Sequence, residues 1–281
     1  MIKVAAIQMC SGVNPVNNAD RLEALVRQAH ADGAHYIQTP EMTGALQRDR
    51  KGLLEILRPE DTDVIVAKAA ALARELSIHL HIGSTAIAVS EGKIANRGLL
   101  FGPDGRIVCR YDKIHMFDVD LDNGESWRES AVYRPGHQAR TADLPFGRLG
   151  FAICYDLRFP QLFRAEALSG VEIISLPAAF TRQTGEAHWE VLIRARAIEN
   201  GVFMVAAAQA GLHEDGRETY GHSMIVDPWG RILAEAPGTG EAVISAELDL
   251  SAVASSRKKI PNLKNAREFE VVETRLNEMA N

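Results

Sequence analysis

The 281-residue chain has the composition of a globular protein with one large core, because 46% of its residues are hydrophobic and 24% are charged. Its net charge of −6, with both signs interspersed, argues against nucleic acid and anionic membranes as partners. Three scattered cysteines, no signal-peptide pattern and no apolar run of bilayer length argue against a disulfide framework, a zinc site and a membrane span, so the cytoplasm is the expected location.

Helical and extended patterns alternate along the chain. The first strand is expected over residues 2–9, and an amphipathic helix follows it, capped by Asn17 or Asn18 and ending near Gly33. In chain order, further strands are expected over residues 34–39, 78–84, 95–101, 106–112, 148–154, 171–176, 202–208 and 242–248, with further helices over 62–76, 160–168 and 185–200. Turn sequences at 103–106 and 227–230 predict hairpins, and the turn at 144–147 leads into the strand that carries Cys154.

This order of elements predicts an α/β fold. Alternating helices and strands, with hairpins in the middle and near the end, favour two packed sheets covered by helices, which is an α-β-β-α sandwich. No repeat or low-complexity linker divides the chain, so residues 1–281 are expected to form a single domain, with 257–281 as a charged C-terminal tail. The polar, aperiodic segment 114–136 is expected to be a functional loop, as long connections inside compact domains usually are.

Cys154 ends an apolar run and is followed at once by polar residues. A strand that delivers a thiol to its carboxyl end and then turns into a helix is how open α/β sheets present a nucleophile. Pro160 suits the first turn of that helix. We therefore expect Cys154 to lie exposed at the sheet edge, where helix dipoles favour the thiolate, and the alternative is a small buried core residue.

Glu41 and Lys113 end two other predicted strands. Because the carboxyl ends of strands in one α/β sheet meet at one edge, these two side chains and Cys154 are expected to come together. A carboxylate can accept the thiol proton, a lysine can hold the oxyanion, and the thiol can form an acyl intermediate. Either charged residue alone is usually solvated surface, so the hypothesis of acyl transfer from a carbon–nitrogen bond depends on the joint pattern.

Four stretches of the sequence resemble the signature of the carbon–nitrogen hydrolase, or nitrilase, superfamily. They are Pro40-Glu41, Tyr111-Asp-Lys-Ile-His115, Gly150-Phe-Ala-Ile-Cys-Tyr-Asp-Leu-Arg-Phe-Pro160 and Asp227-Pro-Trp-Gly230. The resemblance covers about residues 2–249, and the stretch around the cysteine is its most specific part. It implies that Glu41 is a general base, that Lys113 stabilises the oxyanion and that Cys154 is the nucleophile, with no cofactor and no metal.

The resemblance also implies a second glutamate near the nucleophile, and Glu129 matches it. This carboxylate would position substrate and keep Lys113 charged, since an unpaired buried lysine tends to lose its proton. The backbone N–H of Tyr155 is the expected second oxyanion donor. The resemblance further implies a homodimer or larger homo-oligomer that packs helices next to the nucleophile and extends the sandwich across the two-fold axis.

Residues 178–190, 192–200 and 220–224 are similar to the branch typified by deaminated glutathione amidase, which adjoins the ω-amidases. This similarity implies a small carboxylate-bearing amide as substrate, with deaminated glutathione cleaved to 2-oxoglutarate and cysteinylglycine. Arg158 is expected to pair with a substrate carboxylate, Phe180 to pack against the acyl group, and Thr184 to hydrogen-bond to it. The alternative for these three residues is a place in the core or at a helix cap.

Several alternatives stay open. An ω-amidase acting on 2-oxoglutaramate, an N-carbamoyl-amine hydrolase or a nitrilase would use the same three residues, and a catalytically silent binding module would keep only the fold. Residues 118–129 carry acids at positions 1, 3, 5 and 12 of a calcium loop, but the glycine falls at position 7 rather than 6, so calcium is not expected. The acids of this loop predict negative charge at the pocket mouth, which argues against an anionic leaving group.

Overall fold

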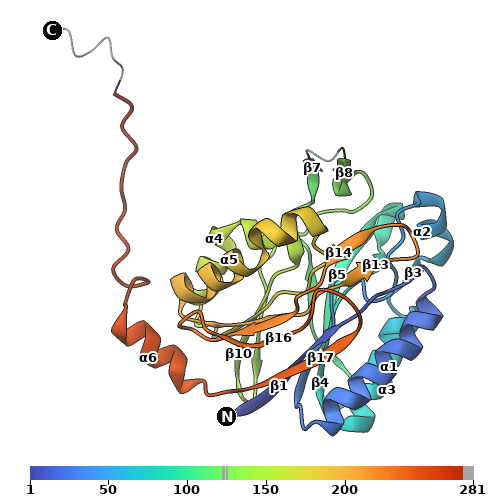
Figure 1. Ribbon diagram of the computed structural model, residues 1–281, viewed down its shortest axis with the longest axis horizontal. Helices are drawn as coiled ribbons and strands as arrows, with labels where there is room; N and C mark the ends of the chain where they lie inside the picture. Colours follow the sequence, from blue (N-terminus) through green and yellow to red (C-terminus); the bar gives the residue numbers. More distant parts are fainter. Residues whose placement is uncertain (122–123, 125, 275–281) are drawn as a thin grey trace.

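Two β-sheets lie face to face, with helices on both outer faces (Figure 1). The computed structural model describes residues 1–121, 124 and 126–274. The predicted α-β-β-α sandwich is confirmed, because each sheet contributes one face to a shared core and the other face to contacts with helices. None of the helices in the described ranges combines the length and the apolar character that a membrane-spanning segment needs.

The first sheet contains the strands that precede Glu41 and Lys113. In spatial order its strands are β17 (Ala242–Leu248), β1 (Ile2–Gln8), β2 (Tyr36–Gln38), β4 (His79–Ala88), β5 (Ile94–Phe101) and β6 (Ile107–Asp112), and β3 (Arg58–Pro59) pairs with β4. Strand β2 is parallel to β4, and β5 is antiparallel to both β4 and β6. The carboxyl ends of β2 and β6 therefore lie at the same end of this sheet.

The second sheet contains the strand that precedes Cys154. Its order is β16 (Ile232–Glu235), β15 (Met224–Val226), β12 (Phe203–Ala206), β11 (Ile173–Ser175), β10 (Gly147–Phe151) and β9 (Thr141–Leu144). Strands β10, β11 and β12 run parallel to one another. A parallel bridge between Met9 and Gln209, just beyond β1 and β12, joins the carboxyl ends of the two sheets.

Side-chain alternation along β1 shows how the layers separate. Val4 and Ala6 face the second sheet and belong to the core between the sheets. Ala5 and Ile7 face the opposite way and pack against α1 (Pro15–Ala31) and α3 (Val64–Leu76). The period of two in a strand thus lets one run of apolar residues supply two separate cores.

The helices on the second sheet come after Cys154 in the chain. Helix α4 has the predicted bounds, Pro160–Leu168, and α5 (Arg182–Asn200) begins three residues earlier than predicted. In Figure 1 both helices lie on the side of the sandwich opposite α1 and α3. Helix α6 (Ser251–Lys259) begins before the predicted tail and covers its first three residues, and residues 275–281 of that tail lie outside the described residues.

Three local predictions were wrong. Asn14, not Asn17 or Asn18, caps α1, because its side chain accepts the N–H of Val16 while Pro15 takes the first helical position. Helix α2 (Arg50–Ile56) was not predicted, since it is short and has one buried residue, Leu53. Strand β10 stops at Phe151, so Cys154 begins a short 3-10 helix, η3 (Cys154–Arg158), rather than ending the strand.

The loop over residues 114–136 contains a short hairpin of β7 (Asp118–Asp120) and β8 (Ser126–Arg128). A second hairpin, β13 (Ala210–Leu212) and β14 (Glu218–Tyr220), lies outside both large sheets. In the predicted calcium-like stretch, residues 122, 123 and 125 lie outside the described residues. Both hairpins contribute to the cavity analysed below.

The corrected helix cap leads to a stability prediction. We expect Asn14→Ala to lower the free energy of unfolding by about 1 kcal/mol, because the N–H of Val16 loses its acceptor. The matched control is Asn17→Ala, an exposed change inside the same helix that is expected to stay within about 0.5 kcal/mol of the wild type. Urea unfolding measures both, and equal losses in the two variants would contradict this assignment of the cap.

Candidate active site

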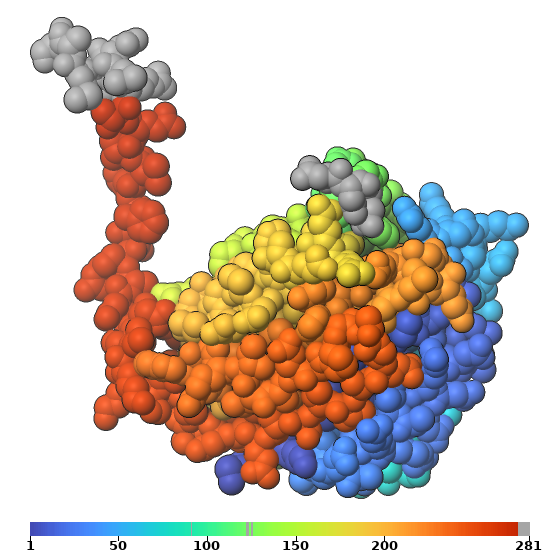
Figure 2. Space-filling view, viewed as in Figure 1, coloured from blue at the N-terminus to red at the C-terminus, as the bar shows by residue number. Residues whose placement is uncertain are grey.

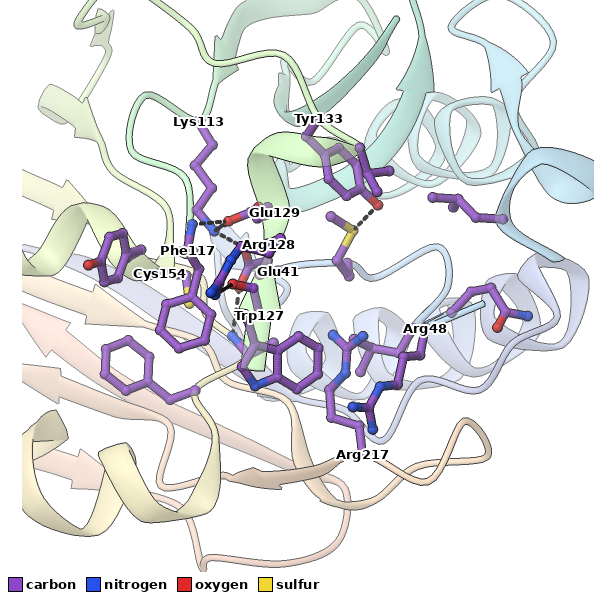
Figure 3. A pocket seen from close by; sticks show the side chains of 18 of the residues that line it. Glu41, Arg48, Lys113, Phe117, Trp127, Arg128, Glu129, Tyr133, Cys154 and Arg217 are labelled. Carbon is purple, nitrogen blue, oxygen red and sulfur yellow. Dashed lines mark hydrogen bonds and ion pairs between the residues drawn. The ribbon is translucent and has the colours of Figure 1, made fainter. Parts of the chain in front are cut away.

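The residues predicted to meet do so, but across two sheets rather than at the edge of one. Glu41 follows β2 and Lys113 follows β6 in the first sheet, whereas Cys154 follows β10 in the second. All three line one cavity of about 300 Å3 at the carboxyl ends of these strands (Figure 3). The sandwich brings them together because the two sheets share an orientation and leave a gap between the loops at that end.

Lys113 is the central charge of this site. Its side chain is only 2% exposed, and Nζ donates to Glu41 Oε1 at 2.8 Å and to Glu129 at 2.8 Å and 3.0 Å. Burial by itself would lower the pKa of Lys113, but the charges of Glu129 and Glu41 outweigh it and raise the pKa well above its usual value. The ammonium group is therefore held charged inside the protein.

Glu41 is held in the ionised form by the same contacts. Oε1 also accepts from Asn96 Nδ2 at 2.9 Å, and Oε2 accepts the backbone N–H of Ala179 at 2.9 Å. Burial alone would raise the pKa of Glu41, but the charge of Lys113 and the surrounding hydrogen bonds lower it below its usual value. A buried carboxylate beside a thiol can act as a proton acceptor.

Cys154 differs from the sequence expectation in two respects. It is buried, with 7% of its surface exposed, and not exposed at a sheet edge. Burial raises the pKa of its thiol well above the usual value, and the charge of Glu41 raises it further against the opposing charge of Lys113. The resting group is therefore a neutral thiol, because nearby negative charge and loss of water outweigh any helix dipole.

The backbone at the site is strained. Cys154 has a φ of 50° and Met42, directly after Glu41, has a φ of 55°, both in the left-handed region that non-glycine residues rarely adopt. The turn at Cys154 leaves the N–H of Tyr155 with no acceptor among the described residues. A free backbone donor next to the thiol can hold an oxyanion.

Asp156 ties the cysteine turn to the lysine strand. Its carboxylate accepts the N–H of Ile153 at 2.8 Å, the hydroxyl of Tyr111 at 2.7 Å and the N–H of His115 at 3.0 Å, and it pairs with the His115 ring at 2.6 Å. Because Tyr111 and His115 flank Lys113, one buried carboxylate sets the position of two loops from different sheets.

Asn96 is a site residue that the sequence analysis missed. Its Nδ2 donates to Glu41 at 2.9 Å and to Glu129 at 3.1 Å, and its backbone carbonyl accepts the N–H of Lys113 at 3.0 Å. The available signal was an amide side chain within an otherwise apolar strand, β5. An amide in a strand does not predict which side chains it contacts, because here they come from two loops that are distant in sequence.

The three predicted substrate residues line the same cavity. The guanidinium of Arg158 lies 5.5 Å from the ring centre of Phe180 and 5.9 Å from that of Tyr155. Phe180 packs on Trp189, with ring centres 4.9 Å apart. The hydroxyl of Thr184 shares a 2.8 Å hydrogen bond with that of Thr181, so part of its hydrogen-bonding capacity is used within the protein.

Of the acids predicted to give the pocket mouth negative charge, Asp122 and Glu125 lie outside the described residues. Asp118 bonds to Ser130 and Asp120 pairs with Arg128, and neither aspartate lines the cavity. Among the described residues, the wall instead carries four arginines besides Arg128. These are Arg48, Arg50, Arg158 and Arg217. The sequence analysis predicted only Arg158 at this place.

No group of three or more His, Cys, Asp or Glu side chains is arranged to hold a metal ion in the part of the chain that the structure describes. Several histidines have contacts with other side chains instead. His81, for example, is buried and contacts the hydroxyls of Tyr36 and Ser175. What the cavity presents is a thiol, two carboxylates and a buried ammonium, a set suited to acyl transfer.

Comparison with known proteins agrees with this chemistry. Residues 3–258 match the family model described as carbon-nitrogen hydrolase. The chain is 39% identical over 278 residues to the deaminated glutathione amidase of Yersinia enterocolitica, covering 98% of this chain and 96% of that protein. It is 36% identical over 267 residues to omega-amidase NIT2 of Mus musculus, covering 94% and 95%.

Solved structures show the same fold. Saccharomyces cerevisiae Nit3, a member of branch 10 of the nitrilase superfamily, superposes with a TM-score of 0.83 at 30% identity, covering 92% of this chain and 94% of that one. Fold, site and relatives together define a hydrolase of carbon–nitrogen bonds other than peptide bonds. The chain belongs to the carbon–nitrogen hydrolase family of the nitrilase superfamily.

The coupling between Glu41 and Cys154 predicts a measurable change in acidity. In Glu41→Gln the negative charge beside the thiol is removed while Lys113 stays, so the pKa of Cys154 falls and the thiolate forms at lower pH than in the wild type. Thiolate absorbance near 240 nm, followed against pH, measures this shift. Subtracting the Cys154→Ser variant of each background isolates the signal, and an unchanged or raised pKa would contradict the proposed charge coupling.

Asn96 leads to a second prediction for this site. Asn96→Leu removes the amide donor that Glu41 and Glu129 share, so each carboxylate loses one of the contacts that position it beside Lys113. We expect kcat to fall by about tenfold to a hundredfold with KM little changed, because displaced catalytic groups slow the chemical step. The pH dependence of kcat should also shift, and a change in KM alone would argue against a positioning role.

Proposed function

We propose that this hydrolase is a cysteine-dependent amidase in which Cys154 is the nucleophile and Glu41 the general base. The observation that carries this proposal is the buried Lys113, bonded to both Glu41 and Glu129 beside a neutral thiol. Lys113 and the N–H of Tyr155 are the proposed oxyanion donors. Glu129 acts electrostatically in this scheme, because its carboxylate keeps Lys113 charged.

The proposed cycle follows from the resting protonation states. Glu41 takes the proton of Cys154 as Sγ attacks the amide carbonyl carbon, and the oxyanion accepts hydrogen bonds from Lys113 Nζ and Tyr155 N–H. The carbon–nitrogen bond then breaks, and Glu41 gives the proton to the leaving amine, which leaves a thioester. Water that loses a proton to Glu41 attacks the thioester, and the carbon–sulfur bond breaks. The proton on Glu41 finally returns to the Cys154 sulfur.

The proposed substrate is deaminated glutathione, hydrolysed to 2-oxoglutarate and cysteinylglycine. Two features support it: the Yersinia enterocolitica relative carries that name, and the cavity has a basic wall suited to carboxylates. Arg158 is proposed to pair with the carboxylate of the acyl group, while Phe180 and Thr184 contact its chain. No cofactor takes part in the proposed cycle.

An ω-amidase acting on 2-oxoglutaramate is the second candidate. The Mus musculus relative carries the omega-amidase name at 36% identity, and the same Arg158 would serve the shared acyl group. The two candidates differ only in the leaving group, which is a dipeptide in one and ammonia in the other.

We also propose a homodimer formed by α4 and α5 of a single-domain chain in the cytoplasm. Leu168, Val191 and Ile198 are between 52% and 67% exposed on these helices, so they do not cover the sheet of their own chain. A second copy that buries this apolar stripe would remove it from water.

Hydrolysis assays with matched cysteine variants test the proposed function. Deaminated glutathione, 2-oxoglutaramate and a small carbamoyl amine are offered side by side to the wild type, and products are resolved. We expect deaminated glutathione to be hydrolysed fastest and Cys154→Ala to lose at least about a thousandfold in kcat, as removal of a nucleophile does. Cys109→Ala is the control, because Cys109 is half-buried on β6 and does not line the cavity.

The results separate mechanism from substrate. Faster turnover of 2-oxoglutaramate would support the mechanism and would identify ammonia, rather than cysteinylglycine, as the leaving group. Release of carbon dioxide with ammonia from the carbamoyl amine would assign a carbamoylase. Hydrolysis by Cys154→Ala at the wild-type rate would contradict the nucleophile itself.

A further inference from the structure

Two arginines lie against one tryptophan on the cavity wall. The guanidinium carbon of Arg48 is 5.1 Å from the centre of the Trp127 ring, and that of Arg217 is 4.7 Å from it. All three residues line the cavity that contains Cys154. Figure 3 shows the two guanidinium groups together beside Trp127, with Cys154 and Lys113 on the other side of the view.

The positive charges of this pair are poorly compensated by the protein. Arg48 has no carboxylate partner in residues 1–121, 124 and 126–274. Arg217 has one contact with Asp215, at 3.4 Å, and its buried Nε has no acceptor among the same residues. Among the described residues, the two acids that line the cavity, Glu41 and Glu129, are already bonded to Lys113. Concentrated positive charge with free donors favours an anionic ligand.

The two arginines and Trp127 come from three separate segments, and each segment is held in place by hydrogen bonds of its own. Arg48 precedes Asp49, whose side chain caps α2 by accepting the N–H of Gly52 at 2.7 Å. Trp127 lies in β8, paired with Val119 of β7. Arg217 lies in the turn between β13 and β14, where its N–H donates to Asp215 at 3.0 Å. Positively charged groups held in this way bind an anion at a lower entropy cost than free surface side chains.

The position of the pair relative to Cys154 indicates which part of the substrate it meets. Arg158 lies by Tyr155 and Phe180, on the wall formed by η3 and the start of α5. Arg48 and Arg217 lie on a different wall, formed by the segment before α2 and the two small hairpins. The cavity therefore has two cationic regions, and the thiol is reached from the same cavity.

We propose that Arg48 and Arg217 form a carboxylate subsite for the leaving amine of the substrate. This inference rests on the proposed amidase function and names its substrate class: amides whose leaving group is an amino acid or dipeptide with a free carboxylate. Guanidinium groups match carboxylate oxygens in planar, two-point hydrogen bonds. Trp127 holds the two guanidinium groups through its ring face. An ammonia leaving group leaves this subsite without a contact.

The experiment compares substrates that differ only at the distal carboxylate. Kinetics are measured with deaminated glutathione, with its terminal carboxamide analogue and with 2-oxoglutaramate, using the wild type, Arg48→Gln and Arg217→Gln. We expect the wild type to favour the acid over the carboxamide by at least about tenfold in kcat/KM, the effect of one charged hydrogen bond. Each variant should raise KM for the acid by a similar factor, with kcat within about threefold and with the other two substrates unaffected.

Arg182→Gln is the matched control. Arg182 lies next to this region in α5 and its removal changes the net charge equally, but its guanidinium already pairs with Glu186 and Glu218 and does not line the cavity. We expect its kinetics to match the wild type with all three substrates. Thermal unfolding confirms that each variant is folded, and Arg48→Gln is the safer variant because Arg48 is exposed and its guanidinium lies against the Trp127 ring.

Binding measurements keep this inference separate from the proposed function. Calorimetry of the wild type with cysteinylglycine and with cysteinylglycinamide should show at least about tenfold tighter binding of the free acid, lost in Arg217→Gln. If none of the substrates is hydrolysed but the free acid still binds more tightly than the carboxamide, the proposed substrate is wrong and the carboxylate subsite is supported. Equal binding of acid and carboxamide, or equal kinetic effects of Arg48→Gln and Arg182→Gln, would overturn the subsite even if amides are hydrolysed.

Discussion

The ion pairing of Lys113 with two carboxylates is the constraint on which the site depends. A lysine that is 2% exposed would lose its proton without compensation, and Glu41 and Glu129 together supply more negative charge than one ammonium neutralises. Burial raises the pKa of the Cys154 thiol, the charge of Glu41 raises it further, and the thiol is neutral at rest. The resting charges of Lys113, Glu41 and Cys154 thus depend on a single buried cluster, because removing Lys113 would leave two buried carboxylates without their counter-ion.

The two-sheet architecture makes this cluster possible. Glu41 and Lys113 come from one sheet, Cys154 comes from the other, and Asp156 links the cysteine turn to Tyr111 and His115 on either side of Lys113. The left-handed backbone at Cys154 is part of the same arrangement, because it places the thiol and the Tyr155 N–H at the start of a short helix. The surrounding strands and helices hold that strained turn in place.

The cavity wall adds positive charge to the surroundings of the Lys113 cluster. Its basic residues lie in two regions, one around Arg158 near the nucleophile turn and one around Trp127 near the small hairpins. Asp118 and Asp120 of the 114–136 loop do not oppose this charge, because they bond within the loop, and Glu129 is paired with Lys113. Changes in these hairpins would alter the leaving-group pocket without disturbing Lys113 or Cys154.

The sequence by itself determined the layered α/β architecture and that Glu41, Lys113 and Cys154 follow three of its strands, because side-chain periodicity and the order of elements are local properties. Its resemblance to a known family also predicted Glu129 and Arg158 as site residues. Tertiary structure alone decided that Cys154 is buried and neutral and that Asn96 joins two glutamates, since both depend on charges brought from the opposite sheet or a distant loop. The pairing of Arg48 with Arg217 has the same origin: 169 positions separate them in the chain, and no local pattern records that they contact one tryptophan ring.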